Sequence, residues 1–370
     1  MPGKVFISVG DISASNYVYE IFKEGFEDFS FVGITNPKLE SIGIKRVALI
    51  SELSVVGLVE VLPRLLKIRR IFSRALDELR NCDALIACDA PGFNLRLIKE
   101  ARKRGVKKVI YFISPQVWAW KPKRAKVIAD FVDDLVVILP FEVDIYRRFK
   151  TLRVHYVGHP LVDMAKPTLN REEFSKKLQL EGPFITLMPG SRWGEIKRHT
   201  PLLKEVIKRV LKKDERFSFV LPTFEEFKGF LLRELSNFGV KLVTEAQVSS
   251  PAYNSMYYSV ASLIASGTAS LEASLLMNPH VVFYRVNPLT LFVAKRMLKV
   301  PHISLANLIL KDRVLPELVN ESPERMTQEL FSLIDNRESI RDRLAGLRVA
   351  LGKQGAVERL RILFRELLTF

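Results

Sequence analysis

The chain has 370 residues, of which 48% are hydrophobic and 26% are charged, which is an ordinary globular composition. This composition excludes a disordered, collagen-like or low-complexity chain, and the length suggests two domains. Lysine and arginine number 57 against 41 acidic residues, and the resulting net charge of +16 favours an acidic partner: nucleic acid, an anionic membrane surface or a phosphorylated substrate.

Cysteine and histidine usage argues against disulfides and metal sites. Cys82 and Cys88 are too few for a disulfide framework, so we expect a reducing compartment and Cys88 packed as a small hydrophobe. The five histidines are scattered and no Asp-x-Asp occurs, so we expect no dedicated metal site. A strand-like run at residues 4–10 leaves no room for a secretory signal, and the uncharged residues 246–271 are too polar for a bilayer span. We therefore expect a cytoplasmic or peripheral protein.

Short β-branched runs alternate with amphipathic helical stretches along the chain. In the first half, strands are expected at residues 4–10, 84–89, 108–114, 135–140 and 154–158, with helices at 94–104 and 121–131. In the second half, strands are expected at residues 184–189, 217–222, 240–244, 262–266 and 280–284, and the pattern is helical from residue 323. Such alternation predicts an α/β chain with two doubly wound, Rossmann-like domains facing across a cleft, and a helical C-terminal segment.

Domain boundaries follow from where the first block of strands ends. Pro167 follows the last strand of that block, so we predict domains at residues 1–166 and 167–335 and a helical segment at 336–370. Ligands of parallel sheets bind at the carboxyl ends of the strands. The distinctive residues of this sequence gather at five such ends: 10–11, 89–92, 114–116, 189–192 and 266–268.

Two of these strand ends have the chemistry of phosphate sites. Gly190, Ser191 and Arg192 combine a flexible turn, backbone amides before a helix and a fixed cation, which suit a diphosphate. A second turn repeats the pattern with Ser266, Gly267 and Thr268, and Glu272 could accept from ribose hydroxyls. Both turns are also compatible with plain capped helix starts, and neither is a Walker or Gly-x-Gly-x-x-Gly loop.

Three further features carry a functional and a structural interpretation. Asp89 ends an apolar strand, where it could act as a general base or cap the next helix. His159 could contact a ligand or be a structural histidine. Residues 114–124 place Trp118 and a second tryptophan beside three cations, which fits a nucleic acid, a sugar with an acidic group, or a packed loop.

Residues 54–81 combine dense apolar side chains with a following run of cations. Val56, Leu58 and Leu62 precede Arg64 and Lys67. This pattern fits an interfacial helix on anionic lipid or a cleft for acyl chains, and equally an ordinary core helix with a basic outer face.

Together, these motifs resemble those of the lipid A disaccharide synthases. The matching segments occur in the family's order at residues 56–62, 114–120, 139–142, 157–160, 189–192, 266–272, 284–285, 304–308 and 316–318. The resemblance extends from about residue 4 to 320 and is most specific at Trp118-Ala-Trp120. It implies a two-domain GT-B-type glycosyltransferase that joins UDP-2,3-diacylglucosamine to 2,3-diacylglucosamine 1-phosphate through a β-1,6 bond and releases UDP.

The resemblance also implies roles for individual residues. Asp89 would be the catalytic base, while the donor site would comprise Gly190, Ser191, Arg192, Ser266, Gly267, Thr268, Glu272 and Asn307. The acceptor side or cleft would comprise Asp11, Ser13, Gln116, Trp118 and His159, and the acyl or membrane contact Val56, Leu58 and Leu62. The family's Gly-Glu-x-Ser-Gly-Asp segment is altered here at Asp11, Ala14 and Ser15, and its later Gln is Asn320, so the departures surround the acceptor side.

The expected partners follow from this assignment. They are the two acylated substrates and the anionic cytoplasmic face of the inner membrane, with no nucleic acid, no cofactor and no metal, and with a homodimer as an option. Two alternatives remain: another UDP-sugar transferase or nucleotide-sugar epimerase of the same architecture, which would not depend on acyl chains, and a non-catalytic basic protein bound to membrane or nucleic acid, which would tolerate replacement of Asp89.

Overall fold

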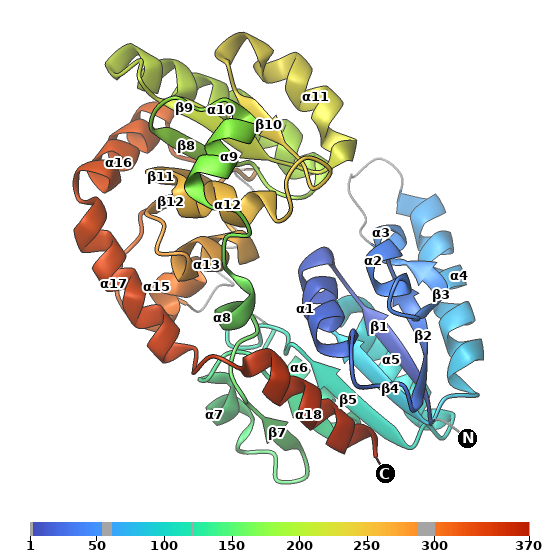
Figure 1. Cartoon of the computed structure of the whole chain (residues 1–370). Coiled ribbons are helices and arrows are strands. Elements are labelled where there is room, and N and C mark those ends of the chain that lie inside the picture. Colours follow the sequence, from blue (N-terminus) through green and yellow to red (C-terminus); the bar gives the residue numbers. More distant parts are fainter. Residues whose placement is uncertain (1–2, 54–60, 120, 288–299, 370) are drawn as a thin grey trace. The chain divides into compact units, whose positions relative to one another are not determined.

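The computed structural model describes residues 3–53, 61–119, 121–287 and 300–369, although the side chains of residues 61–65 lie outside the description. The chain forms two compact units. Unit 1 consists of Met1–Pro160 together with Leu351–Phe370, and unit 2 consists of Leu161–Ala350 (Figure 1).

Unit 1 is built on a seven-stranded parallel sheet in the order β3-β2-β1-β4-β5-β6-β7. Its strands are β1 (Gly3–Val9), β2 (Phe29–Thr35), β3 (Lys45–Leu49), β4 (Ala84–Cys88), β5 (Lys108–Phe112), β6 (Asp134–Val136) and β7 (Arg153–His155). Its helices are α1 (Ile12–Phe22), α2 (Pro37–Glu40), α3 (Ile50–Leu53), α4 (Val61–Leu79), α5 (Pro91–Lys103), α6 (Arg124–Phe131), α7 (Glu142–Tyr146) and α18 (Ala356–Leu368). The central strand β4 is buried along its whole length, as a continuous apolar strand covered on both faces must be.

Unit 2 is built on a six-stranded parallel sheet in the order β10-β9-β8-β11-β12-β13. Its strands are β8 (Phe184–Met188), β9 (Ser218–Pro222), β10 (Lys241–Val243), β11 (Ala261–Ala265), β12 (His280–Tyr284) and β13 (Glu317–Val319). Its described helices are α8 (Leu161–Met164), α9 (Arg171–Leu178), α10 (Trp193–Lys213), α11 (Glu225–Leu235), the 3-10 turn η1 (Ser236–Phe238), α12 (Pro251–Tyr258), α13 (Thr268–Leu275), α15 (Leu305–Leu310), α16 (Pro323–Asp335) and α17 (Arg337–Ala350). Phe174 of α9 packs with Phe184 and Val220 in a buried cluster on this sheet.

The predicted pair of doubly wound parallel sheets is confirmed, and every expected strand is present. The sequence pattern did not predict β2, β3 and β13. Of these, β3 is an edge strand that begins with two exposed cations, and β13 has only three residues, so neither carries a clear apolar run. Cys88 is fully buried in β4, as expected.

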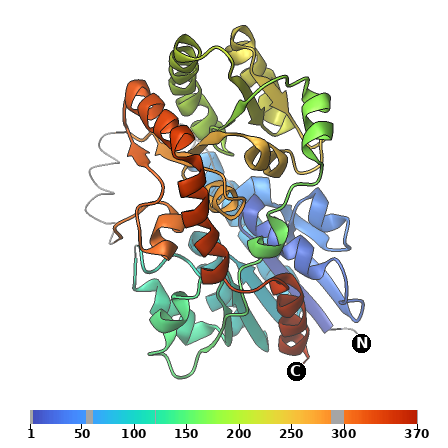
Figure 2. The same cartoon turned by 60° about the vertical axis from the view of Figure 1, so that its left-hand side comes forward.

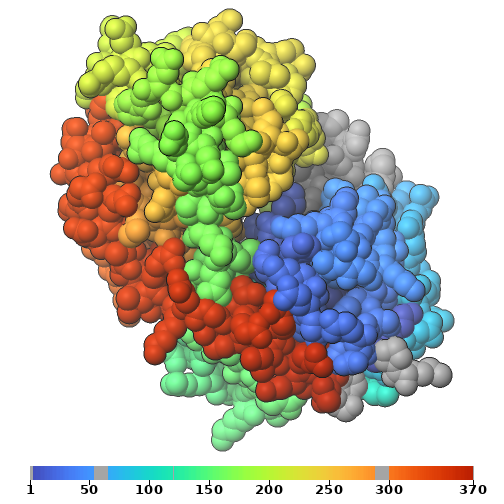
Figure 3. Space-filling model, in the orientation of Figure 1, coloured from blue at the N-terminus to red at the C-terminus, as the bar shows by residue number. Residues whose placement is uncertain are grey.

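The boundaries of the two units, after Pro160 and after Ala350, differ from the predicted domain boundaries after residues 166 and 335. The expected C-terminal segment, 336–370, splits: α17 belongs to unit 2, whereas α18 returns to unit 1 (Figure 2). Phe364 of α18 packs against Phe22 and Phe112, with ring centroids 5.1 and 5.3 Å apart, and Arg361 Nε donates to the Ile21 carbonyl at 3.2 Å. The space-filling view shows α18 directly against the N-terminal residues of unit 1 (Figure 3).

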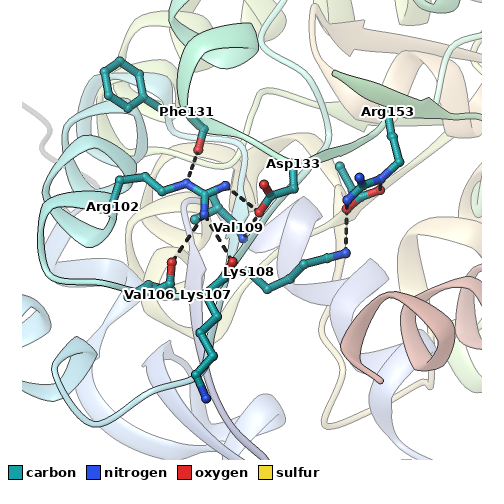
Figure 4. A network of polar contacts seen from close by, with 9 residues as sticks. Arg102, Val106, Lys107, Lys108, Val109, Phe131, Asp133 and Arg153 are labelled. Atoms are coloured by element: carbon teal, nitrogen blue, oxygen red, sulfur yellow. Dashed lines mark hydrogen bonds and ion pairs between the residues drawn. The ribbon is translucent and has the colours of Figure 1, made fainter. Parts of the chain in front are cut away.

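An ion-pair network links the amino-terminal ends of β5, β6 and β7 in the unit 1 sheet. Asp134 is fully buried and accepts from Lys108 Nζ and Arg153 Nη2, each at 2.8 Å, while Arg102 pairs with the adjacent Asp133 (Figure 4). His155 Nε2 also donates to Asp134, at 2.8 Å. Burial alone would raise the pKa of Asp134, but these hydrogen bonds lower it well below its ordinary value. The network therefore fixes β5, β6 and β7 at the edge opposite the strand ends considered next.

No helix in the described ranges combines the length and the apolar character needed to cross a bilayer.

Candidate active site

The carboxyl ends of β1 and β4 lie side by side in unit 1. These strands pair in parallel, and Gly10 N donates to the Cys88 carbonyl at 3.2 Å, which brings Gly10 and Asp11 next to Asp89 and Ala90. Asp11 caps α1, because its Oδ1 accepts from Ala14 N at 2.7 Å. Ser13 is half-buried in the first turn of the same helix.

Asp89 occupies a backbone conformation that non-glycine residues rarely adopt. Its φ is 50° and that of Ala90 is 41°, so two consecutive residues lie in the left-handed region. Two buried side chains hold this turn: Tyr111 Oη donates to the Asp89 carbonyl at 2.7 Å, and Asn94 Nδ2 donates to the same carbonyl at 2.8 Å. Strained backbone that its surroundings over-determine is concentrated at functional sites. The geometry thus fixes the half-buried Asp89 at the sheet edge by its backbone.

Gly10 is required for this arrangement. A Cβ atom on Gly10 would lie 2.2 Å from the Ala90 Cβ and 2.9 Å from the Ala90 nitrogen. A glycine therefore lets the end of β1 approach the strained turn that carries Asp89.

The neighbouring strand β5 leads into the tryptophan-containing loop. Tyr146 Oη and Ser114 Oγ are 2.7 Å apart at the start of this loop, and Trp118 Nε1 donates to Glu142 Oε1 at 3.3 Å further along. Both partners belong to α7 and are buried, and burial raises the pKa of Glu142 to about 8. Gln116, between these two anchors, is exposed. The loop is therefore held at two points and presents Gln116 outward.

His159 lies in the interior of unit 1. Its side chain is 1% exposed, its ring meets Tyr17 edge-on at 5.9 Å, and its backbone nitrogen donates to the Leu351 carbonyl at 3.1 Å. Burial lowers the pKa of His159 to about 3, so the ring is neutral. These contacts favour the structural interpretation of His159 over a ligand contact.

In unit 2, the 189–192 turn joins β8 to α10, and a buried glutamate organises it. Glu195 Oε2 accepts from Ser191 N at 3.0 Å, and Oε1 lies 3.2 Å from Arg192 Nη1. Gly190 has φ 122°, and a Cβ there would come within 2.5 Å of Glu195 Oε2. The Arg192 side chain is 54% exposed. The Arg192 guanidinium is therefore exposed to solvent, and the Glu195 carboxylate of the following helix, α10, lies beside it.

A buried histidine links this turn to the end of β12. His199 Nε2 accepts from Arg285 N at 3.1 Å, so its Nδ1 carries the proton and donates to the Pro189 carbonyl at 2.6 Å. Tyr284 Oη adds a second link, donating to Glu195 Oε1 at 3.3 Å. Burial lowers the pKa of His199, which keeps this bridging tautomer neutral.

The 266–268 turn lies on the strand between these two. β11 pairs with both β8 and β12, and Ser266 N donates to the Phe283 carbonyl at 2.9 Å. Gly267 is exposed at the N-cap of α13, with Ser266 and Thr268 half-buried beside it. Glu272 accepts from Tyr253 Oη at 3.3 Å, and burial raises the pKa of Glu272 to about 7. The sheet thus brings Gly190, Ser191, Arg192, Ser266, Gly267 and Thr268 to one edge.

Asn307, which the resemblance places in the donor site, is held by hydrogen bonds within its own unit. It is fully buried; its Nδ2 donates to Leu315 O and Glu317 Oε1, both at 2.8 Å, and its Oδ1 accepts from Val314 N and Leu315 N. Both amide hydrogens and both lone pairs of its oxygen are engaged within its own unit. These contacts fix the segment between α15 and β13 and favour a structural role of Asn307 over a ligand contact.

The apolar contact residues are only partly covered by the structure. Val56 and Leu58 lie outside the described residues, as does the side chain of Leu62. Further along α4, Leu66 is 54% exposed, and Lys67, Arg69 and Arg70 are exposed around it. Within the described ranges, no three histidine, cysteine or acidic side chains gather in a way that could hold a metal ion.

Sequence reasoning missed the side chains that position the candidates. Asn94, Tyr111, Glu195 and His199 all act on backbone groups of the strand ends. Only Glu195 carried a readable signal, because a glutamate three residues after a helix N-cap is a common capping arrangement. Asp89 and Arg192, the two central candidates, belong to different units.

Comparisons with known proteins bear on this fold and site. The sequence matches the family described as lipid-A-disaccharide synthetase over residues 5–357. It is 52% identical over 364 residues to a lipid-A-disaccharide synthase of Aquifex aeolicus, covering 98% of this chain and 99% of that protein. Among solved structures, a UDP-GlcNAc 2-epimerase from Neisseria meningitidis bound to UDP-GlcNAc aligns with a TM-score of 0.65 and 14% identity, covering 99% of this chain and 100% of the other. The glycotransferase of kitacinnamycin aligns with a TM-score of 0.62 and 13% identity, covering 99% of each chain.

Two Rossmann-like parallel sheets, one in each unit, define a GT-B-type α/β architecture. The structural likenesses, at low identity, support this fold. The sequence relationship is far closer and extends over nearly the whole chain. The chain belongs to the lipid-A-disaccharide synthase family and is a glycosyltransferase.

Proposed function

We propose that the protein transfers diacylglucosamine from UDP-2,3-diacylglucosamine to the 6-hydroxyl of 2,3-diacylglucosamine 1-phosphate. The products are UDP and the β-1,6-linked lipid A disaccharide 1-phosphate. The relatives named lipid-A-disaccharide synthase support the reaction, and the strained, doubly held turn of Asp89 is the observation that supports the position of its base.

The donor is proposed to bind at the carboxyl edge of the unit 2 sheet. The diphosphate would meet the amides at the start of α10 and α13, the hydroxyls of Ser266 and Thr268, and the exposed guanidinium of Arg192. Two UDP-GlcNAc 2-epimerases of the same fold have been solved with UDP-GlcNAc or UDP bound, which supports a UDP-sugar here.

The proposed chemical step is a single inverting displacement. Asp89 accepts the proton of the acceptor 6-hydroxyl while that oxygen forms a bond to the anomeric carbon of the donor. The bond between this carbon and the phosphate oxygen breaks, and the electron pair leaves with UDP. Arg192 and the helix N-termini stabilise the negative charge that develops on the leaving diphosphate. This step needs no cofactor or divalent metal, so activity should persist in EDTA.

Replacement of Asp89 by asparagine tests the base. Asparagine tolerates positive φ, and the groups that hold the turn bind the backbone, so the variant should fold normally. An amide cannot accept the proton, so turnover should fall about 10²–10⁴-fold, while UDP affinity in calorimetry stays unchanged. Mass spectrometry of products from both substrates measures turnover, and near-wild-type turnover by Asp89→Asn would rule out this role.

An epimerase is the alternative that the fold alone would allow. The chain is 14% identical in sequence to the epimerase structure, whereas it is 52% identical to the lipid-A-disaccharide synthase. The same mass spectrometry separates the two, because an epimerase would alter the UDP-sugar without an acceptor.

The proposal also includes docking to the anionic inner-membrane surface through α4. Leu66 and the exposed Lys67, Arg69 and Arg70 supply an apolar and a cationic component, and each cation near an anionic surface contributes about 1 kcal/mol. Vesicle co-sedimentation should require anionic lipid and weaken with salt. Serine at Val56, Leu58 and Leu62 should reduce vesicle binding more than UDP affinity, with circular dichroism as the check on folding. Equal sedimentation by the folded variant would remove this segment from the docking surface.

A further inference from the structure

Four aromatic side chains gather around the start of α10 and on α11 in unit 2. Phe227 is buried at 1% exposure and forms the centre of this aromatic cluster. The Trp193 ring meets Phe227 edge-on at 4.9 Å and Phe230 at 6.0 Å, while Phe224 meets Phe227 at 6.0 Å. Trp193 and Phe224 flank Phe227 and are 37% and 43% exposed.

The aromatic cluster lies at the same sheet edge as the proposed donor site. Trp193 follows Arg192 directly at the first position of α10. Phe224 follows the carboxyl end of β9, and β9 pairs with β8, the strand that leads into the 189–192 turn. Ligands of parallel sheets bind at this edge. The cluster is therefore the apolar neighbour of the turn that would hold the diphosphate.

Packing of unit 2 accounts for only part of this cluster. Phe227 and Leu231 are buried and anchor α11 to the sheet, so the core does not need two further exposed aromatic rings beside them. Lys197 Nζ lies 5.4 Å from the Trp193 ring centroid and offers a cation next to the apolar surface. Neighbouring exposed aromatic side chains form an apolar surface of the kind that marks ligand and interaction sites.

We propose that Trp193 and Phe224 contact an acyl chain of the donor whose diphosphate binds at the 189–192 turn. This proposal rests on the proposed function, in which the donor carries both a diphosphate and acyl chains. Trp193 and Phe224 would then select for chain length at the donor, and the Lys197 ammonium would lie at the polar margin of the acyl contact.

The test compares donors that carry long acyl chains with their diacetyl analogue. Trp193→Ser and Phe224→Ser should each raise the KM for the long-chain donor about tenfold, as expected when part of an apolar contact is lost, and leave the KM for the diacetyl donor and the affinity for UDP nearly unchanged. Trp193→Phe keeps an aromatic ring and should retain most of the preference. Leu232→Ser is the matched control, because Leu232 is 47% exposed on α11, the helix that carries Phe227, but lies outside the aromatic cluster.

A fluorescence measurement gives a second readout that does not depend on turnover. The difference between wild-type and Trp193→Phe emission isolates Trp193, and it should shift to shorter wavelength with long-chain donor but not with UDP alone. Equal losses with long-chain and diacetyl donors would overturn the proposal, as would a Trp193 shift produced by plain vesicles without donor. A wild-type protein that binds no UDP and forms no disaccharide would instead overturn the proposed function.

Discussion

The Glu195 carboxylate lies 3.2 Å from the guanidinium of Arg192, so the cation that would hold the donor is already paired with an anion of its own helix. The second oxygen of Glu195 accepts from the Ser191 amide, and Tyr284 donates to the first. The Glu195 carboxylate thus accepts from a set of hydrogen-bond donors that would also suit a phosphate. A diphosphate bound at this turn, as proposed above, would have to compete with Glu195 or share Arg192 with it.

Glu195→Ala should lower the free energy of unfolding by about 1 kcal/mol, because the Ser191 amide and the Tyr284 hydroxyl lose their acceptor. Urea unfolding measures this change. Glu205→Ala is the control: Glu205 is on the same helix, is half-exposed and pairs only with Lys208 among the described contacts, so its loss should leave the free energy of unfolding nearly unchanged. Equal stability of the two variants would show that Glu195 does not organise the turn.

Gly10→Ala should displace the turn that carries Asp89. The new Cβ would lie 2.2 Å from the Ala90 Cβ, and such overpacking costs about 1–3 kcal/mol. Turnover should fall with stability, because Asp89 follows Ala90 when the backbone shifts. Gly92→Ala offers a nearby comparison, since a Cβ there meets nothing within 4 Å. That variant lies in the first turn of α5 and should be neutral or slightly more stable. A Gly10→Ala protein with wild-type stability and turnover would contradict this account.

The sequence predicted the two sheets and the strand-end candidates because both depend on local patterns. Continuous apolar runs revealed β4 and β8, and the turn residues that follow these strands marked Asp89 and Arg192. The side chains that position these candidates could not be predicted in the same way. Tyr111 and His199 act on backbone groups at the ends of other strands, and Asn94 also donates to the Ser8 carbonyl of β1. These partners are known only once the sheet order is known.

The return of α18 to unit 1 was equally invisible in the sequence. Its apolar stripe shows that it packs on something, but nothing in the stripe distinguishes the sheet of unit 2 from Phe22 and Phe112. The contacts of Asn307 were not predictable for a related reason. A motif marks a residue that matters without saying whether its amide binds a ligand or, as here, four groups of its own unit.

Asn307→Ala should therefore act on stability. Four buried hydrogen bonds are lost, and the unpaired Leu315 and Val314 groups cost roughly 3 kcal/mol together. The UDP affinity of the protein that remains folded should be unchanged, as calorimetry below the unfolding temperature can show. Asn336→Ala removes an exposed asparagine that donates only to Ser332 O among the described contacts, and it should have little effect. Lost UDP binding at unchanged stability would restore the ligand contact.

Glu142 should make stability depend on pH. Its pKa is about 8 in the folded protein against an ordinary value of 4.5, so between these values the folded state binds more protons than the unfolded state. The free energy of unfolding should fall as pH rises through this window, by roughly 1.4 kcal/mol per pKa unit. Urea unfolding of wild type and Glu142→Gln at several pH values isolates the effect, because other groups titrate equally in both. Parallel pH profiles would show that Glu142 stays ionised.

Asp134→Asn supplies a comparison of opposite sign. The pKa of Asp134 is lowered from 3.8, so its ionised form stabilises the fold above that pH and the contribution is lost as pH falls below it. The difference in the free energy of unfolding between wild type and Asp134→Asn should therefore shrink in acid. In the same acid range, the free energies of unfolding of wild type and Glu142→Gln should change with pH at the same rate.

The helix α18 also sets an order of completion during synthesis. Residues 161–350 emerge from the ribosome as one continuous stretch and can close their sheet at once. The earlier unit has to wait, because Phe22 and Phe112 lack Phe364 until residues 351–370 have been made. The unit translated first is thus finished last. A nascent chain that stalls before α18 would leave this aromatic face uncovered, and exposed apolar surface of this kind promotes aggregation.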